Sequence, residues 1–320
     1  MWKRVLLATA IVAATTSLAQ AAPLTVGFSQ VAIESESGWR AAETSVAKSE
    51  AKKRGIALEV TDGHMRQENQ ITAIRGFISR GVDAIFIAPV VATGWEPVLR
   101  EAKRARIPVF LLDRSIDVKD RSLYMTTITA DNVLEGKMLG DWLVKTLNGR
   151  ECLALEIQGT EGSSVVIDRH RGFADAISDA PNIKMIGTYY SDFTREGGRQ
   201  VMENFLKTGD GSKDLCMLYS HNDDMAIGAI QAMKEAGLKP GKEILVGSID
   251  GVPDIYRAML KGEANATVEL TPNMAGPAFD ALEKLKKDGA RPPKLTITES
   301  TLHEPNTAQA VLDQKQKMGY

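Results

Sequence analysis

Short apolar runs alternate with longer amphipathic runs along almost the whole sequence. Runs such as 84–87 (Ala-Ile-Phe-Ile) and 109–112 (Val-Phe-Leu-Leu) are typical of strands that are buried on both faces. Stretches with helical periodicity lie between them, for example 68–79 and 95–105. Strands that alternate with helices predict parallel sheets with right-handed crossovers, so we expect an α/β fold.

The alternation falls into two similar halves, which predict two doubly wound parallel-sheet lobes rather than one large sheet. The tail beyond residue 270 has too few elements for a core of its own, so we expect it to return to both lobes. The chain would then cross between the lobes three times and form a hinge. The expected first lobe is 24–127 with 270–298, and the expected second lobe is 128–269 with 299–320.

The first 21 residues have the features of a signal peptide. Lys3 and Arg4 supply the positive charge, 5–18 is a run of small apolar residues, and 19–21 (Ala-Gln-Ala) fits the cleavage pattern. A membrane anchor is the alternative, but the run is short and rich in Ala and Thr. We therefore expect export to an oxidising compartment.

Cys152 and Cys216 are the two cysteines of the chain. An even number in an exported protein suggests a disulfide, although two buried thiols are an alternative. Both residues precede the apolar part of a strand, in the first and third strands of the second lobe, and these strands are neighbours in a 2-1-3 order. Neighbouring strands lie about 4.8 Å apart, which suits a disulfide. We therefore expect Cys152 and Cys216 to be bonded.

Charge and motifs exclude several classes of function. A formal net charge of -2 and a pI near 6.2 argue against a nucleic-acid-binding protein, which usually has a basic face. The four histidines show no metal-ligand spacing, and the sequence has no phosphate loop, calcium loop or nucleophile elbow. We expect no metal, no cofactor and no catalytic residues.

Polar residues gather where the expected strands end, which is where open α/β sheets bind ligands. Asp113 and Arg114 follow one strand, and Asn222 and Asp250 follow two others. Carboxylates, guanidinium groups and an aromatic plane suit the hydroxyls and apolar face of a sugar. Structural roles are the alternative, because Asn222 precedes a helix that it could cap, and Trp39 could belong to the core.

Several stretches resemble the type I periplasmic sugar-binding proteins, the soluble receptors of ABC importers in the ribose/galactose cluster. They are 24–30, 111–114 (Leu-Leu-Asp-Arg), 221–224 (His-Asn-Asp-Asp) and 248–254. Three further stretches, 35–43, 86–97 and 271–277, most closely resemble members that bind galactofuranose. The resemblance implies a periplasmic, monomeric receptor that captures a monosaccharide, galactofuranose above others, and delivers it to an inner-membrane permease.

The resemblance also implies which residues contact the sugar. The loop 32–36 (Ala-Ile-Glu-Ser-Glu) is two residues longer than the family pattern, which leaves Glu34 or Glu36 facing the sugar; the spacing to Trp39 favours Glu36. Glu269 corresponds to a glutamine contact of ribose-binding relatives. The expected contacts are Glu36, Ser37, Gly38, Trp39, Arg40, Asp113, Arg114, Arg169, Asn222, Asp250 and Glu269.

Three other functions compete with this interpretation. The first is a receptor for another sugar, such as ribose or galactopyranose. The second is a furanoside hydrolase, which needs two carboxylates flanking one bond; here we expect neighbouring Arg and Asn residues to hold the acids ionised instead. The third is a transcriptional regulator with the same two-lobed core, but a signal peptide stands where its helix-turn-helix would be.

Overall fold

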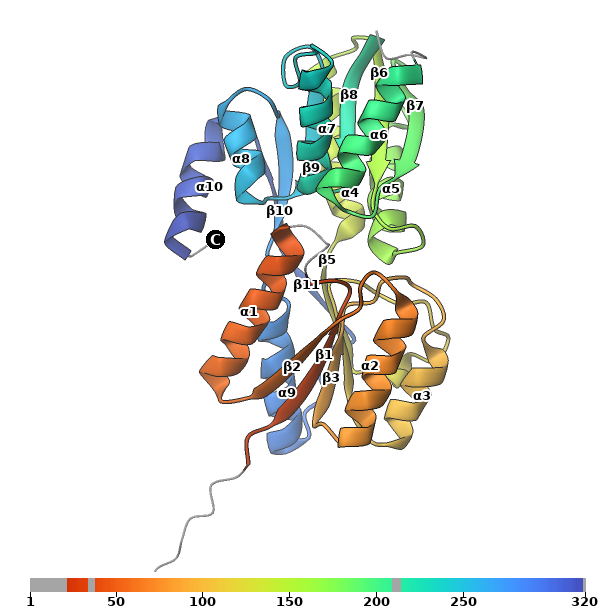
Figure 1. Ribbon diagram of the computed structural model, residues 1–320, viewed down its shortest axis with the longest axis vertical. Coiled ribbons are helices and arrows are strands. Elements are labelled where there is room, and N and C mark those ends of the chain that lie inside the picture. Colours follow the sequence, from red (N-terminus) through yellow and green to blue (C-terminus); the bar gives the residue numbers. More distant parts are fainter. Residues whose placement is uncertain (1–21, 34–37, 209–213, 319–320) are drawn as a thin grey trace, which may run out of the picture.

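The structure is a computed structural model that describes residues 22–33, 38–208 and 214–318. The expected signal peptide, 1–21, lies outside these residues. Two α/β lobes lie one above the other along the long axis of the molecule (Figure 1). Each lobe contains a six-stranded sheet, in the order β11-β5-β4-β3-β1-β2 in the first and β12-β10-β9-β8-β6-β7 in the second. The predicted fold class is therefore confirmed.

The first lobe is formed by the N-terminal part of the chain and by one helix and one strand that return to it from the C-terminal part. Its elements are β1 (Thr25–Gln30), α1 (Gly38–Arg54), β2 (Ala57–Asp62), α2 (Gln67–Arg80), β3 (Ala84–Ile87), α3 (Glu96–Arg104), β4 (Val109–Leu112), η1 (Arg121–Leu123), β5 (Thr126–Ala130), α9 (Ala275–Asp288) and β11 (Leu295–Thr298).

The second lobe repeats the βα alternation and ends with a strand and a helix. Its elements are α4 (Asn132–Leu147), β6 (Cys152–Gln158), α5 (Ser164–Ile177), β7 (Ile183–Tyr190), α6 (Arg195–Thr208), β8 (Leu215–Ser220), α7 (Asp223–Glu235), β9 (Leu245–Asp250), α8 (Pro253–Leu260), β10 (Ala266–Leu270), β12 (Ser300–His303) and α10 (Pro305–Met318).

The chain passes between the lobes three times, from β5 to α4, from β10 to α9 and from β11 to β12. β5 continues to Ala130, which pairs with Thr298 of β11, so this strand stays in the first sheet for three residues beyond the expected boundary at 127. β12 was not expected from the sequence. It pairs antiparallel with β10 and makes the second sheet a mixed one.

Alternating side chains on the strands build a core on each face of each sheet. In the first lobe, Phe86 and Phe110 belong to the same core as Phe279 of α9, whereas Ile85 and Leu111 pack with the residues of α2 and α3. Helices cover both faces of both sheets (Figure 1). This arrangement directs the carboxyl ends of the parallel strands of each lobe toward the other lobe.

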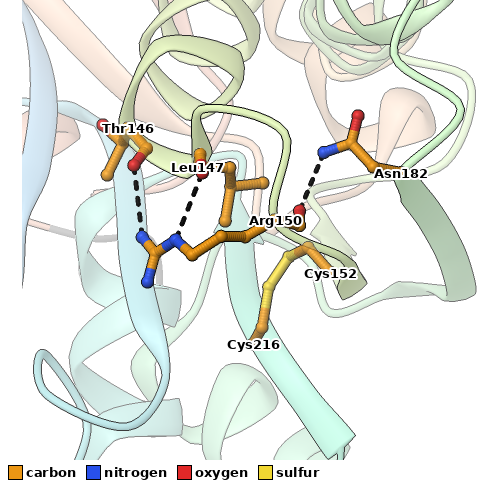
Figure 2. The surroundings of a disulfide bond; sticks show 6 residues. All are labelled: Thr146, Leu147, Arg150, Cys152, Asn182 and Cys216. Atoms are coloured by element: carbon orange, nitrogen blue, oxygen red, sulfur yellow. Dashed lines mark hydrogen bonds between the residues drawn. A yellow bond between two sulfur atoms is a disulfide. The ribbon is translucent and has the colours of Figure 1, made fainter.

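The predicted disulfide between Cys152 and Cys216 is confirmed, with the two Cα atoms 5.4 Å apart. It joins β6 and β8, which are neighbours in the predicted 2-1-3 order. Figure 2 shows it beside Arg150, whose guanidinium donates to the carbonyl oxygens of Leu147 and Thr146. The disulfide lies at the end of the second-lobe sheet that is farther from the first lobe.

Within the described residues, none of the helices combines the length and the apolar character that a membrane span requires.

Candidate functional site

A small polar pocket lies between the two lobes and has a cavity volume of about 20 Å³. Seven of the residues predicted from the sequence line it, and two others, Val165 and Phe193, complete the wall. The seven are Trp39, Arg40, Asp113 and Arg114 of the first lobe and Arg169, Asn222 and Asp250 of the second.

Arg40 on the first turn of α1 is held by two carboxylates. Its guanidinium lies 2.6 Å from Asp113 Oδ2 and 2.6 Å from Glu43 Oε2. Glu43 is fully buried and also accepts a hydrogen bond from Gln30 Nε2 at 2.9 Å. Burial raises the pKa of Glu43, and the nearby Arg40 opposes this shift. The pair Arg40–Asp113 therefore offers a donor and an acceptor that are already fixed in place.

Asp113 and Arg114 follow the last residue of β4. The backbone of Asp113 has a positive φ of 63°, and its carbonyl oxygen accepts a hydrogen bond from the Thr129 hydroxyl. Arg114 is buried and donates to the carbonyl oxygen of Val90 at 3.3 Å. Its guanidinium lies 5.1 Å from the ring centroid of Phe193, so the cation of one lobe stacks on an aromatic ring of the other.

Phe193 is buried after β7, where its backbone has a positive φ of 59°. A side chain at Gly159 would lie 2.0 Å from the Phe193 ring, so only glycine fits beneath the ring. Asn222 Nδ2 donates to the carbonyl oxygen of Phe193 at 3.1 Å. Asp113, Phe193 and Asp250 all have positive φ, a strained conformation that often occurs at functional sites.

Asn222 has both of the roles that the sequence suggested. Its Oδ1 accepts a hydrogen bond from the backbone N–H of Met225 and caps α7, while its side chain lines the pocket. Trp39 also has two roles, because it is only 6% exposed and belongs to the core, yet it borders the pocket. The Trp39 indole N–H donates to the carbonyl oxygen of Leu270 at 3.2 Å, where β10 ends.

Arg169 is the fixed cation of the second lobe and is 3% exposed. Its Nε lies 3.0 Å from Glu135 Oε2, and its Nη1 donates to the carbonyl oxygen of His221 at 2.6 Å. Its Nη2 lies 3.6 Å from Asp250 Oδ1. Arg171, two residues further along α5, is exposed and pairs with Asp168, so it faces away from the pocket.

The sequence predicts that neighbouring cations keep the carboxylates of the pocket ionised. Asp250 does not follow this prediction. Burial raises the pKa of Asp250 well above its usual range, and Arg169 only partly opposes the shift. Asp223 and Asp224 raise the pKa further because they are nearby acids. A raised pKa widens the pH range in which the carboxyl group is protonated, and the protonated form can donate a hydrogen bond as well as accept one.

The structure does not bring Glu269 to the pocket. Its carboxylate lies 2.7 Å from Lys315 Nζ of α10 and accepts a hydrogen bond from the Tyr256 hydroxyl of α8 at 2.6 Å. The side chain of Glu269 points instead to the face of β10 that these two helices cover. Glu36 and Ser37, together with the alternative Glu34, lie outside the described residues.

Val165 had no sequence signal, because an apolar residue in the first turn of a helix looks like any core residue. Phe193 was visible as the aromatic residue after an expected strand, but its positive φ and its contact with Arg114 could not be read from the sequence.

Hydrogen bonds join the lobes around the pocket. The backbone N–H of Ala92 donates to the carbonyl oxygen of Gly162 at 2.9 Å. The backbone N–H of Ser115 donates to Ser164 Oγ at 2.9 Å. These contacts bring the first lobe against the start of α5, so the described pocket lies between lobes that are in contact.

A two-lobed α/β fold with a polar pocket between the lobes is the architecture of a periplasmic binding protein. Residues 28–290 match the family described as periplasmic binding protein domain, and the chain belongs to that family. It is 70% identical to the galactofuranose-binding protein YtfQ of Escherichia coli (strain K12) over the full length of both chains.

Two solved structures are also similar to this chain. One, described as a galactofuranose binding protein, is 71% identical with a TM-score of 0.91, and the match covers 93% of this chain and 100% of that one. The other is the periplasmic binding protein of the arabinose ABC transporter from Shewanella sp. ANA-3, bound to α- and β-L-arabinofuranose. It is 51% identical with a TM-score of 0.88, and the match covers 92% of this chain and 96% of that one.

Proposed function

We propose that this protein is a periplasmic receptor that captures galactofuranose between its two lobes and delivers it to an inner-membrane ABC permease. Residues 1–21 act as a cleaved signal peptide, and the mature protein works as a monomer. The observation that carries the proposal is the two buried arginine–carboxyl pairs at the pocket, Arg40–Asp113 from one lobe and Arg169–Asp250 from the other.

These arginine–carboxyl pairs suit a sugar because each presents a donor next to an acceptor. Sugar hydroxyls donate and accept at once, and a buried group that stays unpaired costs about 1–3 kcal/mol. Asn222 adds an amide, and Trp39 and Phe193 add apolar surface for the carbon face of the ring. The proposed sugar contacts at the pocket are therefore Trp39, Arg40, Asp113, Arg114, Arg169, Asn222 and Asp250. Gly38, at the start of α1, and Glu36 and Ser37, before it, are proposed as contacts from the family resemblance alone.

Binding is coupled to a hinge motion between the lobes. The three connections near Ala130, Leu270 and Glu299 form the hinge that separates residues 24–130 with 271–298 from the rest of the mature chain. A ligand that contacts both lobes stabilises the closed arrangement by the extra contacts that it makes there. The closed form is the one that the permease recognises.

The furanose form is favoured for two reasons. The relative named as a galactofuranose-binding protein shares 70% identity with this chain. A furanose of galactose also carries an exocyclic diol, which needs a donor and an acceptor outside the ring plane, and Arg40 with Glu36 supplies them. A pyranose folds these carbons into its ring and leaves part of that set unpaired, which a site built to bind a hydroxyl rejects strongly.

A thermal-shift panel tests the proposal. Purified mature protein is heated with galactofuranose, hexopyranoses and pentoses, and a ligand that binds the native state raises the unfolding temperature by mass action. We expect the largest shift with galactofuranose. If none of the sugars raises the unfolding temperature, the proposal is contradicted. If ribose or galactopyranose gives a larger shift than galactofuranose, the protein is still a sugar receptor, but galactofuranose is not its preferred ligand.

One observation favours a second candidate, a furanoside hydrolase. Asp250 has the raised pKa that a general acid needs, and Asp113 is a second carboxylate at the same pocket. Asp113 is held by Arg40 at 2.6 Å, which suits ligand binding better than nucleophilic attack. Incubation with a galactofuranoside and an assay for free sugar separates the two functions, and we expect no product above the rate without protein.

A further inference from the structure

Arg169 is oriented by a carboxylate that does not line the pocket. Glu135 on the first turn of α4 is fully buried, and its Oε2 lies 3.0 Å from both Nε and Nη2 of Arg169. Among the described residues, this guanidinium also contacts the carbonyl oxygen of His221 and, at 3.6 Å, Asp250. Glu135 therefore holds the edge of the guanidinium that carries Nε and Nη2, while Nη1 is held by the carbonyl oxygen of His221.

Two glycines allow this contact by bringing α4 and α5 unusually close. A Cβ atom on Gly136 would lie 2.1 Å from the carbonyl oxygen of Arg169, and one on Gly172 would lie 1.9 Å from the carbonyl oxygen of Val133. Larger residues would push the helices apart. Glu135 and Arg169 are thus next to the points of closest approach, where small shifts between the helices are sterically blocked.

The other oxygen of Glu135 contacts a connection between the lobes. Ser300 Oγ donates to Glu135 Oε1 at 2.9 Å, and Ser300 is the first residue of β12, directly after the crossing from β11. Glu135 itself lies five residues beyond the end of β5, where another crossing begins. One buried carboxylate thus links a pocket arginine with two of the three connections.

We infer that Glu135 is a positioning residue, which aims Arg169 at the ligand and ties that arginine to the hinge through Ser300. The inference rests on the proposed sugar-binding function. Glu135 does not touch the ligand; it acts because a guanidinium held along one edge keeps a single orientation. Without the carboxylate, Asp250 is the nearest acid, so the Arg169 side chain turns toward Asp250 and away from the ligand.

The test is a double-mutant cycle on sugar affinity. Calorimetric titration with galactofuranose is done for the wild type, Glu135→Gln, Arg169→Lys and the double variant. Gln keeps the size of the side chain, so the fold is retained, and the unfolding temperature of each unliganded protein is recorded beside its affinity. We expect Glu135→Gln to weaken binding about 10-fold, because the neutral amide oxygen holds the Arg169 guanidinium less strongly than a carboxylate does, and to have little further effect once Arg169 is changed.

Asp141→Asn is the matched control, because Asp141 is an exposed acid on the same helix and pairs only with Lys137 in the described part of the chain. We expect it to bind like the wild type. Ser300→Ala removes only the contact to the hinge, and we expect it to weaken binding about 3-fold, a fraction of one hydrogen bond. Ser300→Ala should not weaken binding further in a protein that already carries Glu135→Gln.

Each of the following results would overturn the inference. Wild-type affinity in Glu135→Gln, or effects of Glu135→Gln and Arg169→Lys that add up fully, would show that Glu135 does not act through Arg169. A fall in unfolding temperature without a change in affinity would make Glu135 structural. Wild-type affinity in Ser300→Ala would remove the link to the hinge. A wild type that binds none of the sugars tested would overturn the proposed function as well.

Discussion

Asp224 of the second lobe accepts a hydrogen bond from the backbone N–H of Gly38 in the first lobe, with Oδ2 and N 2.9 Å apart. Gly38 is the first residue of α1, so the carboxylate of one lobe lies at the positive end of a helix of the other. The second carboxylate oxygen is held by Arg195 at 2.6 Å. Asp224 is almost fully buried, although its partner Arg195 is half exposed.

This contact predicts that Asp224 stabilises the closed arrangement. Asp224→Ala removes a charged hydrogen bond and a favourable interaction with the helix dipole, together worth about 1–2 kcal/mol. We expect the affinity for sugar to fall about 5- to 30-fold, as measured by calorimetry. Asp254→Ala is the control, because Asp254 pairs with the same Arg195 but is exposed. Equal affinities for the two variants would contradict this role of Asp224.

Arg114→Ala is predicted to abolish tight binding while Arg171→Ala does not. The Arg114 guanidinium is buried between Val90 and the Phe193 ring of the other lobe, whereas Arg171 is exposed on the outer side of α5. Truncation of Arg114 leaves buried partners unpaired at a cost of about 1–3 kcal/mol, or about 5- to 150-fold in affinity. Titration of both variants checks this, and similar losses would mean that the pocket is not the binding site.

The disulfide is predicted to stabilise the second lobe without affecting the pocket. It joins Cys152 and Cys216 across 64 residues of sequence, at the opposite end of β6 and β8 from Asn222. The variant with Ala at both positions should lose about 2–4 kcal/mol of unfolding free energy and keep its affinity for sugar. Chemical denaturation measures the first quantity. Two reactive thiols in the unfolded, unreduced wild type would show that the bond is absent.

Glu269 is predicted to matter for stability in acid and not for sugar binding. Burial alone would raise its pKa, but hydrogen bonds from His303, Lys315 and Tyr256 lower the pKa of Glu269 to about 2, from an ordinary 4.5. Because the folded-state pKa is the lower one, the ionised carboxylate stabilises the fold above pH 4.5, and this contribution is lost as the pH falls from 4.5 toward 2.

Glu269→Gln should therefore reduce the unfolding free energy at neutral pH by about 1–2 kcal/mol, a figure reduced for partial exposure. The difference from the wild type should shrink as the pH falls through this window. Denaturation at a series of pH values measures it. If the wild type and Glu269→Gln still differ as much in unfolding free energy at pH 2, or if Glu269→Gln loses sugar affinity at pH 7, the role assigned to Glu269 is contradicted.

Most of the fold could be predicted because it depends on local patterns. Buried strands such as 109–112 and the side-by-side placement of the strands that carry Cys152 and Cys216 follow from apolar runs and from the winding order of a parallel sheet. β12 could not be predicted, since its four residues are stabilised by antiparallel pairing with β10, far away in the sequence.

Residues of the site could be predicted from the sequence where their position along a strand determines whether they reach the pocket. Asp113 and Asn222 follow strand ends and Asp250 is the last residue of β9, so all three reach the pocket. Glu269 lies within a strand, so the face to which it points decides its contacts, and α8 and α10 cover that face. Glu135 carried no signal, because its role depends on the close packing of two helices at Gly136 and Gly172.

The central claim is that the pocket between the lobes selects a furanose, and calorimetric titration of the wild-type protein tests it most directly. Galactofuranose, galactopyranose and ribose are titrated in turn, with the ring forms of each sugar resolved by NMR. We predict that galactofuranose binds most tightly, by at least about 10-fold, since a pyranose lacks the exocyclic diol proposed to bind Arg40 and Glu36. Tighter binding of galactopyranose or ribose would contradict the claim.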